Sequence, residues 1–106
     1  MNNLWDNQLD SAFKSLIALL DELQEPEFSH AISDVYRELL TSPSKERKAI
    51  LRACLRSLLA VHPGGINEMY FDTNGSKTNE LIESVNIVRS YARRRLGDFR
   101  YLPGRL

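Results

Sequence analysis

Apolar residues recur at steps of three and four along most of the chain, which is the spacing of one face of an α-helix. This pattern predicts four helices, at residues 4–24, 27–41, 43–61 and 77–96. No stretch alternates apolar and polar residues as a half-buried strand does. We therefore expect a single all-α domain over residues 1–106, an antiparallel bundle of four main helices with an irregular Pro-Gly-Gly segment before the last helix.

Proline and serine mark the expected helix boundaries. Pro26 disfavours a helical Glu25 and can itself begin the second helix, because the first helical position needs no N–H donor. Ser42 is the expected cap of the third helix, with Pro43 at its first position. In that helix the expected inward residues are Ile50, Leu51, Cys54, Leu55, Leu58, Leu59 and Val61. The expected outward stripe is basic, with Lys45, Lys48, Arg52 and Arg56 at helical spacing.

Most of the helix-breaking residues lie in one segment, from His62 to Gly75. We expect a structural corner there, in which glycines allow close backbone approach and polar side chains cap neighbouring backbone groups. The corner residues are Gly64, Gly65, Asn67 and Glu68. The apolar run from Ile66 to Phe71 fits either a short helix or an extended stub, and the pattern does not decide between them.

Composition is that of a globular protein, with 42% hydrophobic and 26% charged residues. The longest apolar run, Leu16 to Leu20, is far shorter than a bilayer-spanning helix. The N-terminus has no basic region ahead of an apolar stretch, so we expect a cytoplasmic protein that does not enter a membrane. The single cysteine, Cys54, lies in an apolar helical pattern and is expected in the core.

The formal net charge of zero hides a strong segregation of charge along the chain. Residues 1–42 carry eight acids and two bases (net −6), and residues 43–62 carry one acid and five bases (net +4). Residues 63–88 carry four acids and one base (net −3), and residues 89–106 carry one acid and six bases (net +5). Such blocks either neutralise one another within the fold or present separate charged surfaces to partners.

The sequence contains no arrangement typical of an enzyme or a metal site. His30 and His62 are the only histidines, and neither belongs to a paired metal-binding motif. Gly64 and Gly65 lack the lysine and the preceding strand of a phosphate-binding loop. We expect no cofactor and no catalysis, and an enzyme that uses Glu68 or His62 beside the glycine corner is the least favoured alternative.

A nucleic-acid-binding regulator is the main alternative function. The arginines at 93–95, with Arg89 one turn earlier, can contact phosphates, and so can the basic stripe of the third helix. However, cations near a helix C-terminus are favoured by the helix dipole, and overall neutrality is unlike the basic surplus of nucleic-acid-binding proteins. Pairing within the chain is therefore the preferred interpretation of these arginines, and nucleic acid is not the expected partner.

The segment from Leu58 to Arg95 resembles a family of small uncharacterised bacterial helical proteins. In that family a helix ends in Gly-Met-Gly-Ser, followed by Leu-Asn-Asp, a loop and a last helix. Gly64-Gly65 stands at the Gly-Ser position, Ile66-Asn67-Glu68 resembles Leu-Asn-Asp, and His62-Pro63 departs from the pattern. The resemblance implies a helical fold without an enzymatic motif. Similar small helical proteins also occur as immunity proteins of bacterial toxins, including those of contact-dependent growth inhibition systems.

These observations together predict a protein-binding inhibitor, an immunity protein that neutralises a bacterial toxin. The expected partner is a nuclease domain, because an acidic surface can occlude the basic active site of a nuclease. The expected partner-binding residues are the acids of the first two helices: Asp6, Asp10, Asp21, Glu22, Glu27, Asp34 and Glu38.

Overall fold

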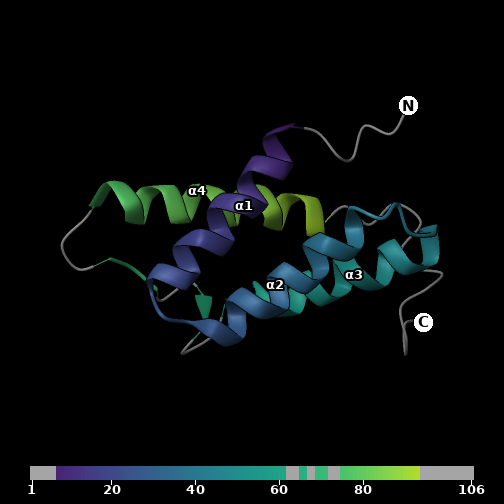
Figure 1. The fold of residues 1–106 in the computed structure, drawn as a ribbon, viewed down its shortest axis with the longest axis horizontal. Helices are drawn as coiled ribbons and strands as arrows, with labels where there is room; N and C mark the ends of the chain where they lie inside the picture. The colour runs from purple at the N-terminus through teal and green to yellow at the C-terminus, as the bar shows by residue number, and fades with distance from the viewer. Residues whose placement is uncertain (1–6, 62–64, 67–68, 72–74, 94–106) are drawn as a thin grey trace.

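A computed structural model describes residues 7–61, 65–66, 69–71 and 75–93 (Figure 1). These residues form four helices: α1 (Asn7–Glu22), α2 (Pro26–Leu39), α3 (Lys45–Leu58) and α4 (Gly75–Ala92). The described part of the chain contains no strand, which confirms the all-α class expected from the sequence. The helix ends agree with the expected ranges to within three residues wherever both ends are described.

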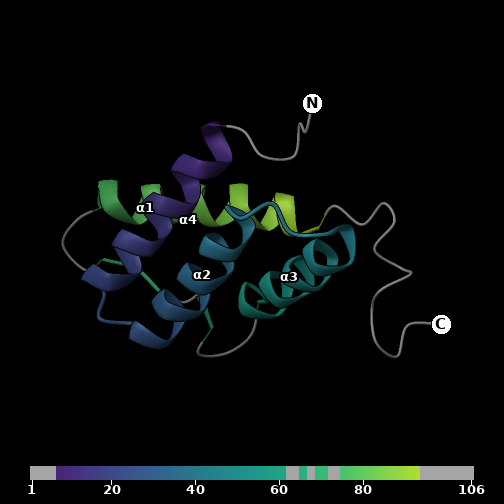
Figure 2. The ribbon, with the colours of Figure 1, turned by 45° about the vertical axis from the view of Figure 1, so that its right-hand side comes forward.

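Each helix packs against the helix that precedes or follows it, and α4 closes the arrangement by packing against α1. Contacts at both ends show that α1 and α2 form an antiparallel hairpin, since Asp10 meets Tyr36 and Asp21 meets Ser29. In both views α2 and α3 lie side by side, and α1 runs obliquely to α4 (Figures 1 and 2). The largest helix interface is the one between α1 and α4.

One hydrophobic core joins all four helices. The largest fully buried side chains come from every helix and from the loops after α3: Phe13, Leu16, Leu20, Ile32, Leu55, Leu59, Leu81 and Val88. Phe13 of α1 stacks on Tyr36 of α2, with ring centroids 5.3 Å apart and an interplanar angle of 27°. This core fixes the helices around one another and leaves the acidic residues of α1 and α2 at its edge.

The turn between α1 and α2 follows the sequence prediction. Gln24 adopts a left-handed conformation (φ 59°), and the N–H of Glu25 donates to the carbonyl of Leu20 at 3.0 Å. This is the Schellman arrangement, which satisfies the last carbonyls of a helix. Pro26 then begins α2, as expected from its missing N–H and fixed φ.

The cap of α3 lies two residues later than predicted, and Pro43 therefore precedes the cap and is not the first helical residue. Ser44, and not Ser42, is the N-cap residue, and its side-chain oxygen accepts a hydrogen bond from the backbone N–H of Arg47 at 3.2 Å. Ser42 instead adopts a positive φ of 55° in the turn after α2. The two serines flank Pro43 symmetrically, so the cap depends on which serine has the extended conformation, and that is Ser44.

The orientation of α3 about its axis also differs from the prediction. Leu51, Leu55 and Leu59 are buried as expected, but Ile50 (42% exposed) and Cys54 lie on the outside. Arg52, expected on the outside, is only 7% exposed. Val61 after the helix, which was also expected inward, is exposed, and on α4 Ile82 is exposed as well.

Arginine chemistry explains this rotation of α3. The guanidinium of Arg52 lies 5.8 Å from the ring centroid of Tyr91, a cation–π distance. Arg56 Nη1 donates to the carbonyl oxygen of Ala92 at 2.5 Å, and Arg89 Nη2 of α4 donates to the carbonyl oxygen of Leu59 at 2.7 Å. Each arginine thus caps the C-terminal end of the other helix, and the long apolar stems of such side chains can be buried while their polar heads are satisfied.

The segment between α3 and α4 packs on the core without forming a regular helix at residues 69–71. Ile66 is buried, and Phe71 is partly buried against the core. Thr78 of α4 holds this segment in place, because its hydroxyl accepts from the Phe71 N–H at 2.8 Å and lies 3.3 Å from the Phe71 carbonyl oxygen. The described residues combine the two conformations left open by the sequence, since the Met69 N–H donates to the Ile66 carbonyl at 3.2 Å in a single tight turn and residues 69–71 are not helical.

Candidate partner-binding surface

The acidic residues of α1 and α2 fall into two groups that differ in how far the chain itself neutralises them. Asp10, Asp34 and Glu38 each form an ion pair with a basic residue of this protein. Asp21, Glu22 and Glu27 lie around the turn between the two helices, where Glu22 pairs with Lys77 of α4. Asp6 lies outside the described residues. The structure therefore does not present the seven predicted acids as one uniform surface.

Asp10 is held between two partners at the start of α1. The hydroxyl of Tyr36 donates to its Oδ1 at 2.7 Å, and Lys14 Nζ lies 3.1 Å from its Oδ2. The Tyr36 hydrogen bond, with the smaller effect of Lys14, lowers the pKa of Asp10. Burial, followed by the negative charge of Asp10, raises the pKa of Tyr36 to about 12. Asp10 therefore stabilises the α1–α2 hairpin as part of an internal hydrogen-bonded pair.

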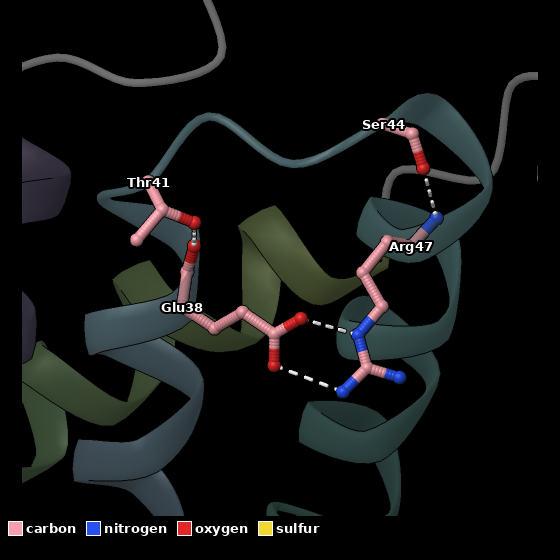
Figure 3. Close-up of polar contacts among 4 residues, drawn as sticks. All are labelled: Glu38, Thr41, Ser44 and Arg47. Atoms are coloured by element: carbon pink, nitrogen blue, oxygen red, sulfur yellow. Dashed lines mark hydrogen bonds and ion pairs between the residues drawn. The ribbon is translucent and has the colours of Figure 1, made fainter.

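Glu38 and Arg47 form a bidentate ion pair that joins α2 to α3 (Figure 3). Arg47 Nη2 lies 2.9 Å from Glu38 Oε1, and Arg47 Nε donates to Glu38 Oε2. The pair lowers the pKa of Glu38 and raises that of Arg47. Two parallel N–H donors match the geometry of a carboxylate, so Glu38 is engaged within the fold.

Asp34 is neutralised locally. Arg37 Nη2 lies 2.6 Å from Asp34 Oδ1, three residues along the same helix. Both side chains are largely exposed, and such pairs typically contribute little to stability. The partner residue nonetheless cancels the local negative charge, so Asp34 contributes less to an acidic surface than its exposure suggests.

The strongest concentration of negative charge is at the turn between α1 and α2. We define the acidic corner as Asp21, Glu22, Glu25 and Glu27, four carboxylates within seven residues. Ser29 donates its hydroxyl hydrogen to Asp21, and Lys77 at the start of α4 forms an ion pair with Glu22. Glu27 lies in the first turn of α2, where a negative charge is favoured by the helix dipole. Among the ion pairs of the described residues, this corner contributes one, between Glu22 and Lys77.

Glu25 was not among the residues predicted for partner binding. It is partly buried at the N-cap position of α2, and its side chain makes no capping hydrogen bond. The sequence contains the signal that identifies it, because four acids at 21, 22, 25 and 27 are closer together than any others in the chain.

The basic residues do not form the continuous stripe considered for nucleic acid. On α3, Lys45 is exposed, Lys48 is half-buried and Arg52 is buried. Arg56 and Arg89 donate to helix-end carbonyls. Arg93 is exposed, whereas Arg94 and Arg95 lie outside the described residues. Intramolecular contacts of the kind preferred in the sequence interpretation therefore account for Arg52, Arg56 and Arg89.

The predicted structural corner is described only in part. Gly65 is buried in a bend next to buried Ile66, which agrees with close backbone packing at this point. Gly64, Asn67 and Glu68 lie outside the described residues, as does His62. Among the residues that the structure describes, no three His, Cys, Asp or Glu side chains converge as a metal site would require.

No helix of the described chain is both long and apolar enough to cross a bilayer. Comparison with known proteins gives no match to any family model, to any curated protein or to any solved structure. The functional interpretation therefore depends on the geometry and charge of the chain itself.

The hydrogen bond between Tyr36 and Asp10 has a testable pH dependence. The Tyr36→Phe variant is expected to lose about 1 kcal/mol of unfolding free energy at neutral pH, the typical net value of one hydrogen bond. Because the pKa of Tyr36 is raised in the folded state, its contribution is complete below the unfolded value of about 10 and is lost as pH rises toward about 12. Because the pKa of Asp10 is lowered, its contribution is present above about 3.9 and is lost at lower pH.

Urea denaturation of both proteins across pH 2–5 and pH 9–12 measures these effects. The difference in stability between wild type and Tyr36→Phe should be largest at neutral pH and should shrink toward both extremes. A difference that stays constant from pH 3 to pH 12 contradicts the pairing of Tyr36 with Asp10.

Proposed function

We propose that this protein is a stoichiometric protein-binding inhibitor, an immunity protein that neutralises a bacterial toxin in the cytoplasm. The observation that supports the proposal is the acidic corner, where four carboxylates lie within seven residues at the turn between α1 and α2 and one of them, Glu22, pairs with Lys77. Asp10, Asp34 and Glu38 each pair with a basic residue, so the proposed contact surface centres on this corner, where Lys77 pairs with Glu22, one of the four carboxylates. The function requires no catalytic residue and no cofactor.

The charge of the corner also favours one kind of target. A nuclease binds a polyanion and therefore has a cluster of Lys and Arg side chains at its active site. A carboxylate cluster on a rigid helical hairpin is complementary to such a site, and charge complementarity accelerates association and selects among partners. The proposed toxin is accordingly a nuclease whose active site the corner covers.

The proposal can be tested by reversing charge at the corner. The test protein is the product of the reading frame adjacent to this one, which the proposal predicts to contain a nuclease domain, purified and titrated against this protein by calorimetry. The Glu22→Lys/Glu27→Lys variant is expected to bind on the order of 100-fold more weakly, which corresponds to roughly 2.8 kcal/mol. The loss should lie mainly in the association rate and should diminish at high salt.

The matched control is Glu46→Lys/Glu83→Lys, which makes the same charge change at two exposed positions, one in the first turn of α3 and one on α4 beyond the turn that carries Lys77. Circular dichroism verifies that both variants are folded. The control should retain wild-type affinity to within about threefold, since remote surface charges act weakly at physiological salt. Equal loss in both variants, or no binding by wild type, overturns the proposal.

A further inference from the structure

A groove lies between α4 and the segment that precedes it. Its volume is about 330 Å³. Met69 and Tyr70 form one wall, and Ile82 and Val85 of α4 form the other. Asn86 and Arg89 continue along the α4 wall by helical steps and supply the polar groups. A mainly apolar groove with a few polar groups is the usual form of a small-molecule site.

The walls of this groove contain apolar surface that the core does not use. Tyr70 is 60% exposed and Ile82 is 52% exposed, whereas Leu81 and Val85 beside Ile82 are buried. Apolar residues therefore occur on α4 outside the face that packs against α1 and α3, while a surface helix usually carries polar residues there. Covering Tyr70 and Ile82 with an apolar ligand would remove this surface from water.

Arg89 gives the groove a positive group at one end. Its Nη2 atom donates to the Leu59 carbonyl oxygen at 2.7 Å, which holds the side chain in a half-buried position. Within the described residues no carboxylate forms an ion pair with it. Burial, followed by the charge of Arg93, lowers the pKa of Arg89. A guanidinium has five N–H donors, so those not directed at Leu59 can bind an anionic group.

We propose that the groove binds a small monocarboxylate with an unbranched apolar chain of medium length. The chain lies against Tyr70, Ile82 and Val85, and the carboxylate accepts hydrogen bonds from Arg89. The volume of about 330 Å³ is at the lower end of the range for ligand pockets, which favours a medium over a long chain. The proposed ligand site uses no residue of the acidic corner. The groove can therefore fail to bind a carboxylate while the protein still acts as an inhibitor, and the inhibitor proposal can fail while the groove binds its ligand.

The test is an NMR titration of the ¹⁵N-labelled protein with octanoate, 1-octanol and octylammonium, all below their aggregation concentrations. Octanoate is expected to give saturable shifts centred on residues 69–71 and 82–89. Octanol should bind about tenfold more weakly, because it lacks the charge-assisted hydrogen bond, and octylammonium more weakly still. Absence of saturation by octanoate, or equal affinity for all three probes, overturns the proposal.

Two matched pairs of variants locate the site. Ile82→Gln should weaken octanoate binding about tenfold, whereas Ile50→Gln, at an isoleucine of α3 that is 42% exposed, should leave it unchanged. Arg89→Gln should abolish the preference for octanoate over octanol, whereas Arg93→Gln, at the exposed neighbouring cation, should retain it. If Arg89→Gln does not fold, the comparison of Ile82→Gln with Ile50→Gln and the relative affinities of the three probes still test whether the groove binds octanoate. An equal loss in Ile50→Gln and Ile82→Gln, or a preference retained in folded Arg89→Gln, rules the site out.

Discussion

Replacement of Phe13 by alanine is expected to lower the free energy of unfolding by about 3–5 kcal/mol. Phe13 is fully buried at the centre of the core, and its ring stacks on Tyr36 with centroids 5.3 Å apart. The variant loses the burial of the aromatic ring and leaves a cavity that the surrounding helices fill only in part. Because domains of this size are typically stable by about 5–15 kcal/mol, the loss is a large part of the total.

Urea denaturation followed by far-ultraviolet circular dichroism measures this change. Phe13→Leu, which keeps most of the apolar volume, should lose less than half as much. Tyr70→Ala removes an aromatic ring that is 60% exposed and should change the unfolding free energy by less than about 1 kcal/mol. Similar losses in Phe13→Ala and Tyr70→Ala would show that Phe13 does not lie in the core.

The second large effect is expected from charge reversal in α3. Arg52→Glu should cost about 3 kcal/mol or more, since it places an uncompensated negative charge at a position that is only 7% exposed. The variant also replaces the cation that lies over the ring of Tyr91. If α3 had the orientation predicted from its apolar residues, Arg52 would face solvent and the same substitution would be almost neutral.

Thermal and urea unfolding of Arg52→Glu and Lys45→Glu test this orientation. Lys45 is exposed at the start of α3, and its reversal should change the unfolding free energy by less than about 0.5 kcal/mol. Arg52→Met, which keeps the apolar stem without the charge, should fall between the two. Equal stability of Arg52→Glu and Lys45→Glu would indicate that Arg52 is in solvent.

The candidate sites were predictable from the sequence to different degrees. The acidic corner lies within seven consecutive residues, so its charge density is visible in the sequence. The sequence does not show that Arg47 neutralises Glu38 or that Lys77 pairs with Glu22, because these partners lie on other helices. The groove was missed for the same reason. The sequence left the conformation of residues 66–71 open, and only the packing of this segment against α4 brings Tyr70 and Ile82 to one groove.

The sequence by itself determined the helices and their breaks. Three local effects were enough for this: helical periodicity, the restriction that Pro26 imposes on Glu25, and the tolerance of a helix start for proline. Each acts within a few residues, so it can be evaluated without knowledge of the fold. The same local arguments identified the buried leucines of α3 at 51, 55 and 59.

Tertiary structure alone decided which flank of those leucines turns inward. One flank carries Ile50 and Cys54, the other carries Arg52 and Arg56, and hydrophobicity favours the first. The structure turns the second inward, with Arg52 buried and Arg56 partly buried, because Tyr91 and the Ala92 carbonyl of α4 offer partners to the two arginines. Burial of a charged side chain depends on the groups that surround it, and here those groups lie more than 30 residues away, beyond the reach of any local pattern.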